Sequence, residues 1–408
     1  MNFKSEFLNE INERGFIYQH IDIKDLDNLM SKNKISGYIG FDITSDSLHV
    51  GSLIQLMLLH WLDFYGHQSI ALIGGGTTLI GDPSGKDQTR KILSKKEIDR
   101  NISNIELTFS RFINLQNNSL IINNYEWLSN LNYIDFLREF GSRITLNKML
   151  TFDSIKSRLD REQPLTILEF NYMLLQAYDF YYLNKNHNCV LQMGGSDQWG
   201  NILSGVDLIR KINKNEAFGV TSPLITNSDG SKMGKTADGA VWLNKEKISS
   251  LNFFQFWRNV NDQDVSRFLY LFTKLPLDEI KKLSALKNQE INEAKKILAF
   301  EVTKIVRGTE EANEALEIAD NTFNSKIVDQ RLPNISQNVS DIENNNFTIL
   351  DAIEKLKLAS SRSEVKRLIK SDGIKVNDTL YKNNDLSLRE YSALKEIKIA
   401  VGKKKIGI

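Results

Sequence analysis

A glycine-containing segment at residues 38–52, YIGFDITSDSLHVGS, has the composition of a phosphate-binding helix start. Gly40 and Gly51 would let a ligand approach the backbone closely, since neither carries a side chain. The first turn of a following helix would offer free N–H groups, and Thr44 and His49 could add side-chain donors. Taken alone, the segment also fits an ordinary helix start with a histidine near its beginning.

A second segment, GDPSGKDQTR at residues 81–90, joins acidic and basic residues in one loop. Asp82 could position an amine or a ribose, and Lys86 and Arg90 could hold phosphates. The GxxxxGK[ST] spacing of a Walker loop is absent. A surface loop of this composition is equally common.

The third segment, GSKMGKTADG at residues 230–239, places Lys232 and Lys235 three positions apart among glycines. Such a loop could close on a transferring phosphate group, although solvated Lys/Gly loops are frequent. None of these segments pairs a nucleophile with a base. A reaction in which the substrate attacks, and the protein only orients and stabilises charge, would need no such pair.

The fourth segment, EFNYMLLQAYDF at residues 169–180, places three polar groups on one helical face. Tyr172, Gln176 and Asp179 stand at i, i+4 and i+7, as in a pocket that binds a polar small molecule. The alternative is a helix whose polar face meets solvent. A Gly-Gly turn in QMGGSDQWGN (192–201) adds Gln192, Asp197 and Gln198.

Alternating strands and helices must position these residues. Apolar runs predict strands at 36–42, 68–74, 119–124 and 188–195, and helices at 49–66, near 95–115 and at 196–212. This alternation predicts a doubly wound α/β body with a parallel sheet. Ligands bind such sheets at the carboxyl ends of the strands, where the chemical segments fall. The segment 75–90 reads as an irregular loop because it is rich in glycine.

The second part of the chain has a different character. Residues 251–319 read as mostly helical and 320–346 as a polar linker, and from Phe347 a basic helix, a turn at Asp372-Gly373 and a strand follow. Residues 351–408 hold 14 Lys/Arg and 8 Asp/Glu, although the whole chain has a net charge of only +1. The basic tail suggests a polyanionic partner, or a solvated lysine-rich end.

Composition excludes several classes of protein. With 408 residues, 41% hydrophobic and 25% charged, the chain is globular rather than disordered or fibrous. The single cysteine, Cys189, and five scattered histidines form no zinc-binding pattern. No signal peptide or membrane-length apolar run is visible. We therefore expect a cytoplasmic protein.

Together these segments resemble a known family. HVGS and KMGKT resemble the HIGH and KMSKS pair of class I aminoacyl-tRNA synthetases. The patterns YxGFDxTxxSLHxG, GDPSGK, YxxxQxxD and GGSDQWGN are similar to the bacterial tyrosyl-tRNA synthetase branch. The tail resembles the small RNA-binding domain that ends those chains.

The resemblance implies an architecture and a two-step reaction. It implies a Rossmann-like doubly wound catalytic domain (1–245, with a helical dimer-interface insertion near 125–165). An α-helical anticodon-side domain (246–325), a linker (326–346) and a small α+β RNA-binding domain (347–408) would follow. L-tyrosine and ATP would give tyrosyl-adenylate and pyrophosphate, and tRNA(Tyr) would then accept the tyrosyl group. Magnesium would travel with ATP, with no metal site on the protein, and neither DNA nor a membrane is an expected partner.

The resemblance also assigns roles to individual residues. Tyrosine would be bound by Tyr38, Asp82, Tyr172, Gln176, Asp179 and Gln192. ATP and the adenylate would be bound by Gly40, Asp42, His49, Gly51, Ser52, Asp197, Gln198 and Lys235. Catalysis would use Thr44, His49, Lys86, Arg90, Lys232, Lys235 and Thr236. The basic helix carries the candidate tRNA contacts Arg362, Lys366, Arg367 and Lys370.

Two residues depart from the class pattern. Ser52 replaces the last histidine of HIGH, and Gly234 replaces the first serine of KMSKS.

Three other functions compete with this interpretation. They are a tryptophanyl enzyme, a small-molecule nucleotidyl transferase of the same fold, and a non-catalytic RNA-binding protein derived from a synthetase. The candidate hydroxyl-reading pair Tyr38 and Asp179 argues against the first, the basic tail against the second, and the intact signature segments against the third.

Overall fold

The computed structural model describes residues 2–82, 93–116, 118–236, 239–324, 332–359, 361–383, 385–402 and 405–408. The chain folds into two compact units. The first contains Met1–Gly234, Trp242–Lys247 and Asn261–Ile291, and the second contains Lys235–Val241, Ile248–Val260 and Asn292–Ile408. Each unit is described by itself below.

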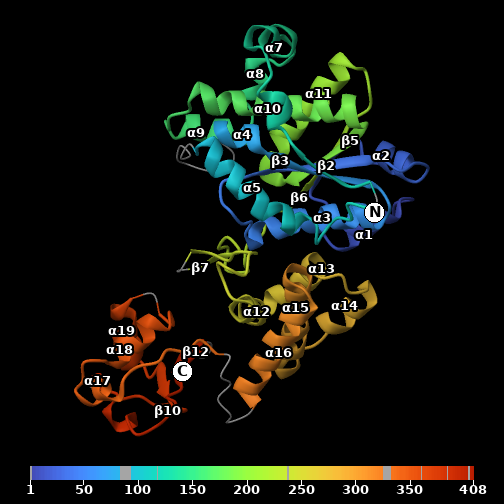
Figure 1. Cartoon of the computed structure of the whole chain (residues 1–408). Helices are drawn as coiled ribbons and strands as arrows, with labels where there is room; N and C mark the ends of the chain where they lie inside the picture. Colours follow the sequence, from blue (N-terminus) through green and yellow to red (C-terminus); the bar gives the residue numbers. More distant parts are fainter. Residues whose placement is uncertain are drawn as a thin grey trace. The chain divides into compact units, whose positions relative to one another are not determined.

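A six-stranded sheet with the order β1-β6-β5-β2-β3-β4 forms the centre of the first unit (Figure 1). Its strands are β1 (Gln19–Ile21), β2 (Ser36–Asp42), β3 (Gln68–Gly74), β4 (Leu120–Asn123), β5 (Cys189–Gly195) and β6 (Phe218–Ser222). All neighbouring pairs are parallel except β1 with β6. Because β2, β3 and β5 are mostly buried, helices must cover both faces of the sheet.

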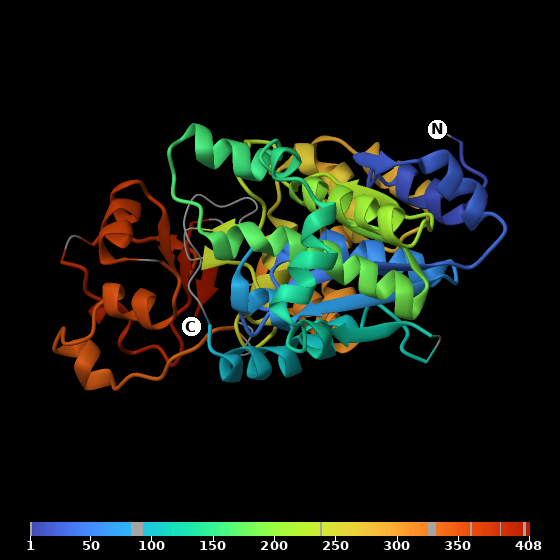
Figure 2. The same cartoon turned by 90° about the horizontal axis from the view of Figure 1, so that it is seen from above.

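Helices do cover both faces. α10 (Ile167–His187) and α11 (Trp199–Ile212) pack together on one face, and α3 (Leu53–Phe64) lies on the other, as Figures 1 and 2 show from two directions. The remaining α-helices of this unit are α1 (Glu6–Glu13), α2 (Ile23–Met30), α4 (Gly75–Ile80), α5 (Lys95–Phe109), α6 (Tyr125–Leu128), α7 (Tyr133–Glu139), α8 (Leu146–Met149), α9 (Asp153–Asp160), α13 (Asp262–Phe272) and α14 (Leu277–Ser284). The doubly wound α/β fold predicted from the sequence is thus confirmed.

The second unit is helical at first and mixed towards its end. Its helices are α12 (Ser250–Arg258), α15 (Ile291–Arg307, beginning on the last residue of the first unit), α16 (Thr309–Asn324), α17 (Val339–Glu343), α18 (Ile349–Lys355) and α19 (Arg362–Lys370). The strands β9 (Ile374–Val376), β10 (Thr379–Leu380), β11 (Ile399–Val401) and β12 (Lys405–Gly407) form an antiparallel sheet with the order β10-β9-β11-β12. A hydrophobic core between residues 342 and 401 holds this sheet to its helices. The predicted order of basic helix, turn and strand in the tail is confirmed.

Several predicted element boundaries were wrong. The helix expected near 95–115 ends at Phe109, and the 320–346 segment contains the last residues of α16 and all of α17. The short strands β1 and β6 were not predicted. Each has few residues, and the three residues of β1 are held by antiparallel pairing with β6, so neither shows a periodicity of its own.

The glycine-rich stretch after β3 is a helix, α4, rather than the expected loop. A Cβ atom on Gly75 would lie 2.3 Å from Oδ1 of Asn123, and one on Gly76 would lie 3.0 Å from the Leu128 side chain. The N–H of Gly76 donates to Oδ1 of Asn124 at 2.7 Å. The glycines here permit close packing of a helix against the end of β4, which local composition does not reveal.

Candidate active site

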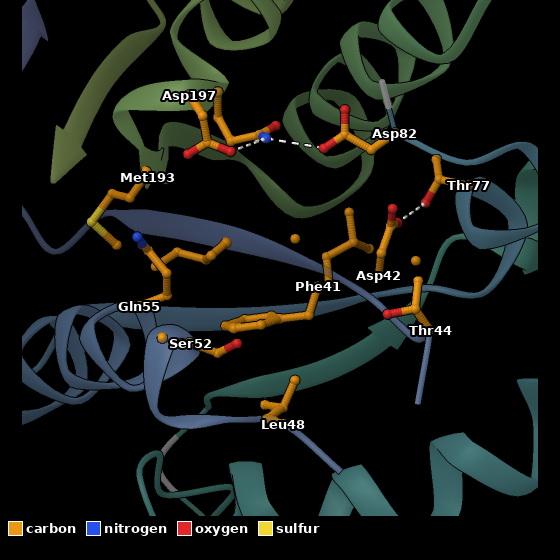
Figure 3. Close-up of a pocket in the computed structure, with 18 of the residues that line it drawn as sticks. Phe41, Asp42, Thr44, Leu48, Ser52, Gln55, Thr77, Asp82, Met193 and Asp197 are labelled. Atoms are coloured by element: carbon orange, nitrogen blue, oxygen red, sulfur yellow. Dashed lines mark hydrogen bonds between the residues drawn. The ribbon is translucent and has the colours of Figure 1, made fainter. Parts of the chain in front are cut away.

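A cavity opens where two neighbouring strands of the central sheet separate. The ladder between β2 and β5 ends at the pair Tyr38–Gln192. Beyond this pair, β2 remains bonded to β3 as far as Asp42, and β5 remains bonded to β6 as far as Gly195. A cavity of about 400 Å³ lies at these carboxyl ends (Figure 3), where the strand order reverses and α/β sheets bind ligands.

Most of the site residues predicted from the sequence line this cavity. They are Tyr38, Gly40, Asp42, Thr44, His49, Gly51, Ser52, Asp82, Tyr172, Gln176, Asp179, Gln192, Asp197 and Gln198. Lys232 lies outside it, exposed and in an antiparallel bridge with Thr226. Lys235 and Thr236 form strand β7 (Lys235–Thr236) in the second unit. Lys86 and Arg90 lie outside the described residues. The structure brings the first set together, while the roles of individual residues stay predictions.

Asp179 is a buried carboxylate at one end of the cavity. Its Oδ2 accepts a hydrogen bond from Nδ2 of Asn124 at 2.9 Å, and its Oδ1 accepts one from Nε1 of Trp127 at 2.7 Å. Burial raises the pKa of Asp179 to about 7, and nearby Asp42 acts in the same direction. The carboxyl group is therefore held in one orientation and titrates near neutrality.

The Tyr38 hydroxyl belongs to the same end of the cavity. Its ring packs against Phe180 at 5.3 Å between centroids, and its oxygen has no hydrogen-bond partner within the described part of the chain. Burial, and then the neighbouring Asp179, raise the pKa of Tyr38 well above its ordinary value. A buried hydroxyl without a partner is costly, so this end fits a ligand that brings its own hydroxyl.

Hydrogen bonds connect Asp179 to a second carboxylate, Asp42. Thr77 donates to Oδ1 of Asp42 at 3.0 Å (Figure 3), and Asn124 donates to Thr77 at 3.1 Å. The Tyr172 hydroxyl donates to Oδ2 of Asp42 at 3.2 Å. The ends of β2 and β4, the start of α4 and one face of α10 are thus joined by one chain of polar contacts.

An amide network forms the opposite wall. Nε2 of Gln198 donates to Asp82 at 3.1 Å and to Asp197 at 3.0 Å (Figure 3). Gln176 donates to Oε1 of Gln198 at 3.2 Å, and Asn201 donates to Oε1 of Gln176 at 2.8 Å. Together with Asp42, the carboxylates Asp82 and Asp197 line the cavity, an arrangement suited to an ammonium group.

The helix that carries Tyr172, Gln176 and Asp179 is fixed at its first turn. Thr166 and Glu169 form a reciprocal capping box at the start of α10. Glu169 also pairs with the buried guanidinium of Arg158 at 3.1 Å. These contacts set the position of the polar face that points into the cavity.

His49 caps the short 3-10 turn Val50–Ser52 that precedes α3. Its Nδ1 accepts a hydrogen bond from the N–H of Gly51 at 2.9 Å, so a neutral ring carries its proton on Nε2. A Cβ on Gly51 would lie 2.6 Å from Cε1 of His49, so a larger residue at position 51 would displace the imidazole ring from this position. His49 also lies edge-on to Trp242, with ring centroids 6.3 Å apart.

The two signature segments meet in the structure. Gly234 has a φ of +79°, and a Cβ there would lie 3.3 Å from Cβ of Val50 and 3.4 Å from the nitrogen of Gly51. This positive φ strains residues other than glycine. Gly234 is therefore explained by the backbone conformation at this contact, although the class pattern has serine there.

Five residues of the site were not predicted from the sequence. Thr77, Asn124 and Trp127 support the carboxylates, Asn201 supports Gln176, and Gln55 lines the cavity with its amide donating to Ser222 at 2.9 Å. The position of Asn124 at the carboxyl end of the predicted strand 119–124 was the one available signal. The others lie within helices, where their types alone indicate nothing about function.

Of the four basic residues predicted to contact tRNA on helix α19, one is already paired with carboxylates in the structure. Arg362 pairs with Asp351 at 2.7 Å and with Glu354 at 2.8 Å. Lys366, Arg367 and Lys370 are exposed, and no ion pair of theirs occurs within the described part of this unit. The latter three offer the uncompensated positive charge.

Two searches of the described residues gave negative results. No group of three or more His, Cys, Asp and Glu side chains is arranged to hold a metal ion. No helix among the residues covered by the structure has the length and apolarity needed to cross a bilayer.

Comparisons with known proteins agree on one family. The family model described as tRNA synthetases class I (W and Y) matches residues 30–324. A tyrosine–tRNA ligase of Pelagibacter ubique is 50% identical over 407 residues, covering 98% of both chains. One from Orientia tsutsugamushi is 48% identical over 404 residues, covering 98% of this chain and 97% of the relative. The structure of a C-terminally truncated mitochondrial tyrosyl-tRNA synthetase of Aspergillus nidulans has a TM-score of 0.70 at 29% identity, covering 78% of this chain and 94% of that one.

The raised pKa of Asp179 predicts a pH dependence of stability. The pKa of Asp179 is about 7 in the folded protein, whereas its ordinary value, expected in the unfolded chain, is 3.8. Between these two pH values the folded state therefore binds more protons than the unfolded state. Stability conferred by protonated Asp179 is therefore lost as pH rises from about 4 to about 7, and is constant above that. Urea unfolding of the ligand-free protein and of Asp179→Asn should show a difference that grows over this window by at most a few kcal/mol. Parallel curves would contradict the buried, shifted carboxyl group.

Proposed function

The chain belongs to the class I tRNA synthetases of the tryptophan and tyrosine family, and we propose that it joins L-tyrosine to tRNA(Tyr). ATP activates tyrosine to tyrosyl-adenylate with release of pyrophosphate. The tyrosyl group then passes to the terminal adenosine of the tRNA. Full-length similarity to tyrosine–tRNA ligases supports this reaction, and the paired hydroxyl and carboxylate of Tyr38 and Asp179 are the structural observation that carries the choice of amino acid.

Tyr38 and Asp179 would bind the phenol hydroxyl of tyrosine. The Tyr38 oxygen lacks a partner within the described residues, and Asp179 lies beside it with a fixed orientation. Phenylalanine would leave the buried Tyr38 hydroxyl without a partner and would bring no donor to Asp179, which disfavours it strongly. Tryptophan brings no hydroxyl either. Asp82, Tyr172 and Gln176 would hold the α-ammonium group, with Gln192 close by.

The chemistry requires positioning and charge stabilisation rather than a protein nucleophile. The tyrosine carboxylate attacks the α-phosphate while pyrophosphate leaves. Gly40, Asp42, Gly51, Ser52, Asp197 and Gln198 would bind the adenylate portion. Thr44, His49, Lys86, Arg90, Lys232, Lys235 and Thr236 would stabilise the pyrophosphate. Contacts that strengthen as the leaving group gains charge raise the rate instead of merely tightening ATP binding. Mg²⁺ would be carried by the ATP phosphates and water, its preferred oxygen ligands.

The tail would bind tRNA through the free positive charges of α19. Lys366, Arg367 and Lys370 support this role, whereas Arg362 already pairs with two carboxylates. We propose that the chain is divided into four parts: a catalytic part (1–245), a helical anticodon-side part (246–325), a linker (326–346) and an RNA-binding part (347–408). The cytoplasm, where tRNA is charged for translation, is the proposed location.

A homodimer with its interface near residues 125–165 is proposed from exposed apolar side chains. Within this segment Tyr133, Ile134 and Leu146 are 63%, 69% and 57% exposed, and Ile167, just beyond it, is 79% exposed. Apolar exposure concentrated in one segment is typical of a protein interface.

ATP–pyrophosphate exchange with tyrosine, tryptophan and phenylalanine tests the function directly. Tyrosine alone should support exchange, because only its hydroxyl satisfies Tyr38 and Asp179. Asp179→Ala should weaken tyrosine binding and reduce discrimination against phenylalanine by about tenfold or more. Exchange with tryptophan would favour the other branch of the family, and no exchange with any of the three would favour the RNA-binding alternative.

Removing the free charges of α19 should reduce the salt dependence of tRNA binding. The triple change of Lys366, Arg367 and Lys370 to Gln removes up to three phosphate contacts, which should lower the slope of log K against log salt by about two to three. Arg362→Gln is the matched control and should change the slope less. Equal slopes for the wild type and the triple variant would remove α19 from the tRNA interface, provided that tyrosine-dependent exchange is unchanged.

Charge placed on the exposed apolar segment should dissociate the proposed dimer. Ile134→Lys is expected to give monomers in sedimentation velocity at micromolar concentration, since a lysine cannot be buried there without a partner. Leu107→Lys is the matched control, because Leu107 is 70% exposed on α5, outside the segment. A monomeric wild-type protein would rule out the dimer.

A further inference from the structure

The segment that leads into the second signature is a short hairpin at residues 225–233. The N–H of Met233 donates to the carbonyl oxygen of Ile225 at 3.2 Å, and Thr226 and Lys232 form an antiparallel bridge. The Met233 side chain is buried. The first arm of the hairpin therefore determines where the backbone carrying Lys232 lies.

Helix α13 is hydrogen-bonded to this first arm at two backbone groups. Oδ2 of Asp264 accepts a hydrogen bond from the N–H of Ser228 at 3.0 Å. Arg267, one turn further along, donates to Oδ1 of Asp264 at 2.9 Å and also to the carbonyl oxygen of Thr226. The Asp264 side chain is only 4% exposed, whereas that of Arg267 is 43% exposed. The carboxylate and the guanidinium form one unit that binds two backbone groups of the hairpin.

The same helix is fixed against α3, whose preceding turn carries the first signature. α13 packs on α3. The guanidinium of Arg14 donates to the carbonyl oxygens of Tyr270 and Thr273 at 3.0 and 3.1 Å, and lies 4.2 Å from the centre of the Trp61 ring on α3. α13 is thus bound on one side to the helix behind HVGS and on the other to the hairpin before KMGKT.

We propose that Asp264 and Arg267 are positioning residues for tyrosine activation. They hold the hairpin so that Lys232, and the backbone leading to Lys235, are placed for the pyrophosphate that leaves ATP. Neither side chain lines the cavity, so both act through the hairpin. This role rests on the proposed function. It identifies α13 as the element that sets the distance between the HVGS turn and the segment carrying Lys232.

The role predicts a loss in rate rather than in tyrosine binding. The tyrosine end of the cavity is built from β2, β4 and α10, and its hydrogen bonds do not involve α13. Charge stabilisation at the leaving group depends steeply on geometry, and a displacement of about 1 Å can cost about a hundredfold in rate. Loosening the hairpin should therefore slow adenylate formation selectively.

Single-turnover adenylate formation at saturating tyrosine and ATP, normalised to titrated active sites, tests the proposal on the full chain. Asp264→Asn should lower the rate constant by about tenfold or more, because an amide oxygen cannot serve both Ser228 and Arg267 as a carboxylate does. The dissociation constant of tyrosine, from equilibrium dialysis, should stay within about twofold of wild type. Arg267→Met, at the more exposed position, should slow the step in the same direction, because methionine has no donor for Thr226 or Asp264, both of which Nη2 of Arg267 binds.

Asp278→Asn on α14 is the matched control. Asp278 pairs with Lys281 at the same i,i+3 spacing, but both are exposed and belong to a different helix. This variant should activate tyrosine at the wild-type rate.

A wild-type rate per active site in Asp264→Asn and Arg267→Met would overturn the proposal. Equal losses of tyrosine affinity and rate would also overturn it, since they would indicate general disruption of the fold. A wild-type protein unable to activate tyrosine would instead refute the proposed function itself.

Discussion

The separation of β2 from β5 beyond Tyr38 and Gln192 is the constraint on which the site depends. Each strand keeps its other neighbour, so the sheet remains continuous on both sides while its centre opens. The opening exposes backbone at Gly40, where an added Cβ would meet nothing within 4 Å. Because the segments after β2, β3 and β5 leave the sheet at this edge and α10 adds its polar face there, the opening brings several separate segments into one cavity.

The two ends of that cavity differ in how they are held. At one end, the chain of hydrogen bonds from Asp42 through Thr77 and Asn124 to Asp179 fixes buried polar groups that could not remain unpaired. Such a site is rigid before any ligand binds, which suits discrimination between similar amino acids. At the other end, His49 caps the short turn that precedes α3. Gly234, about 180 residues later in the chain, packs against Val50 and Gly51 of this turn.

The departures from the class pattern have different standing. Gly234 occupies a positive φ against Val50 and Gly51, which gives glycine a physical reason. Ser52 lines the cavity, and the structure gives no compensating reason for its shorter side chain. The first departure therefore follows from backbone geometry, whereas nothing in the structure explains the second.

The sequence alone determined the doubly wound sheet, the strands from Ser36 and Gln68, the polar face of α10 and the family, because these depend on local periodicity and on short motifs. Only the tertiary structure revealed the supports of the site: Asn124 and Trp127 on the buried carboxylate, and Asp264 on the hairpin. Each of these contacts joins residues more than 30 positions apart, and a residue type carries no record of its distant partner. The helical form of the glycine-rich stretch after β3 was likewise decided by packing. Local composition favours a loop there, whereas close contacts with Asn123 at the end of β4 and with Asn124 and Leu128 beyond it accompany the helix.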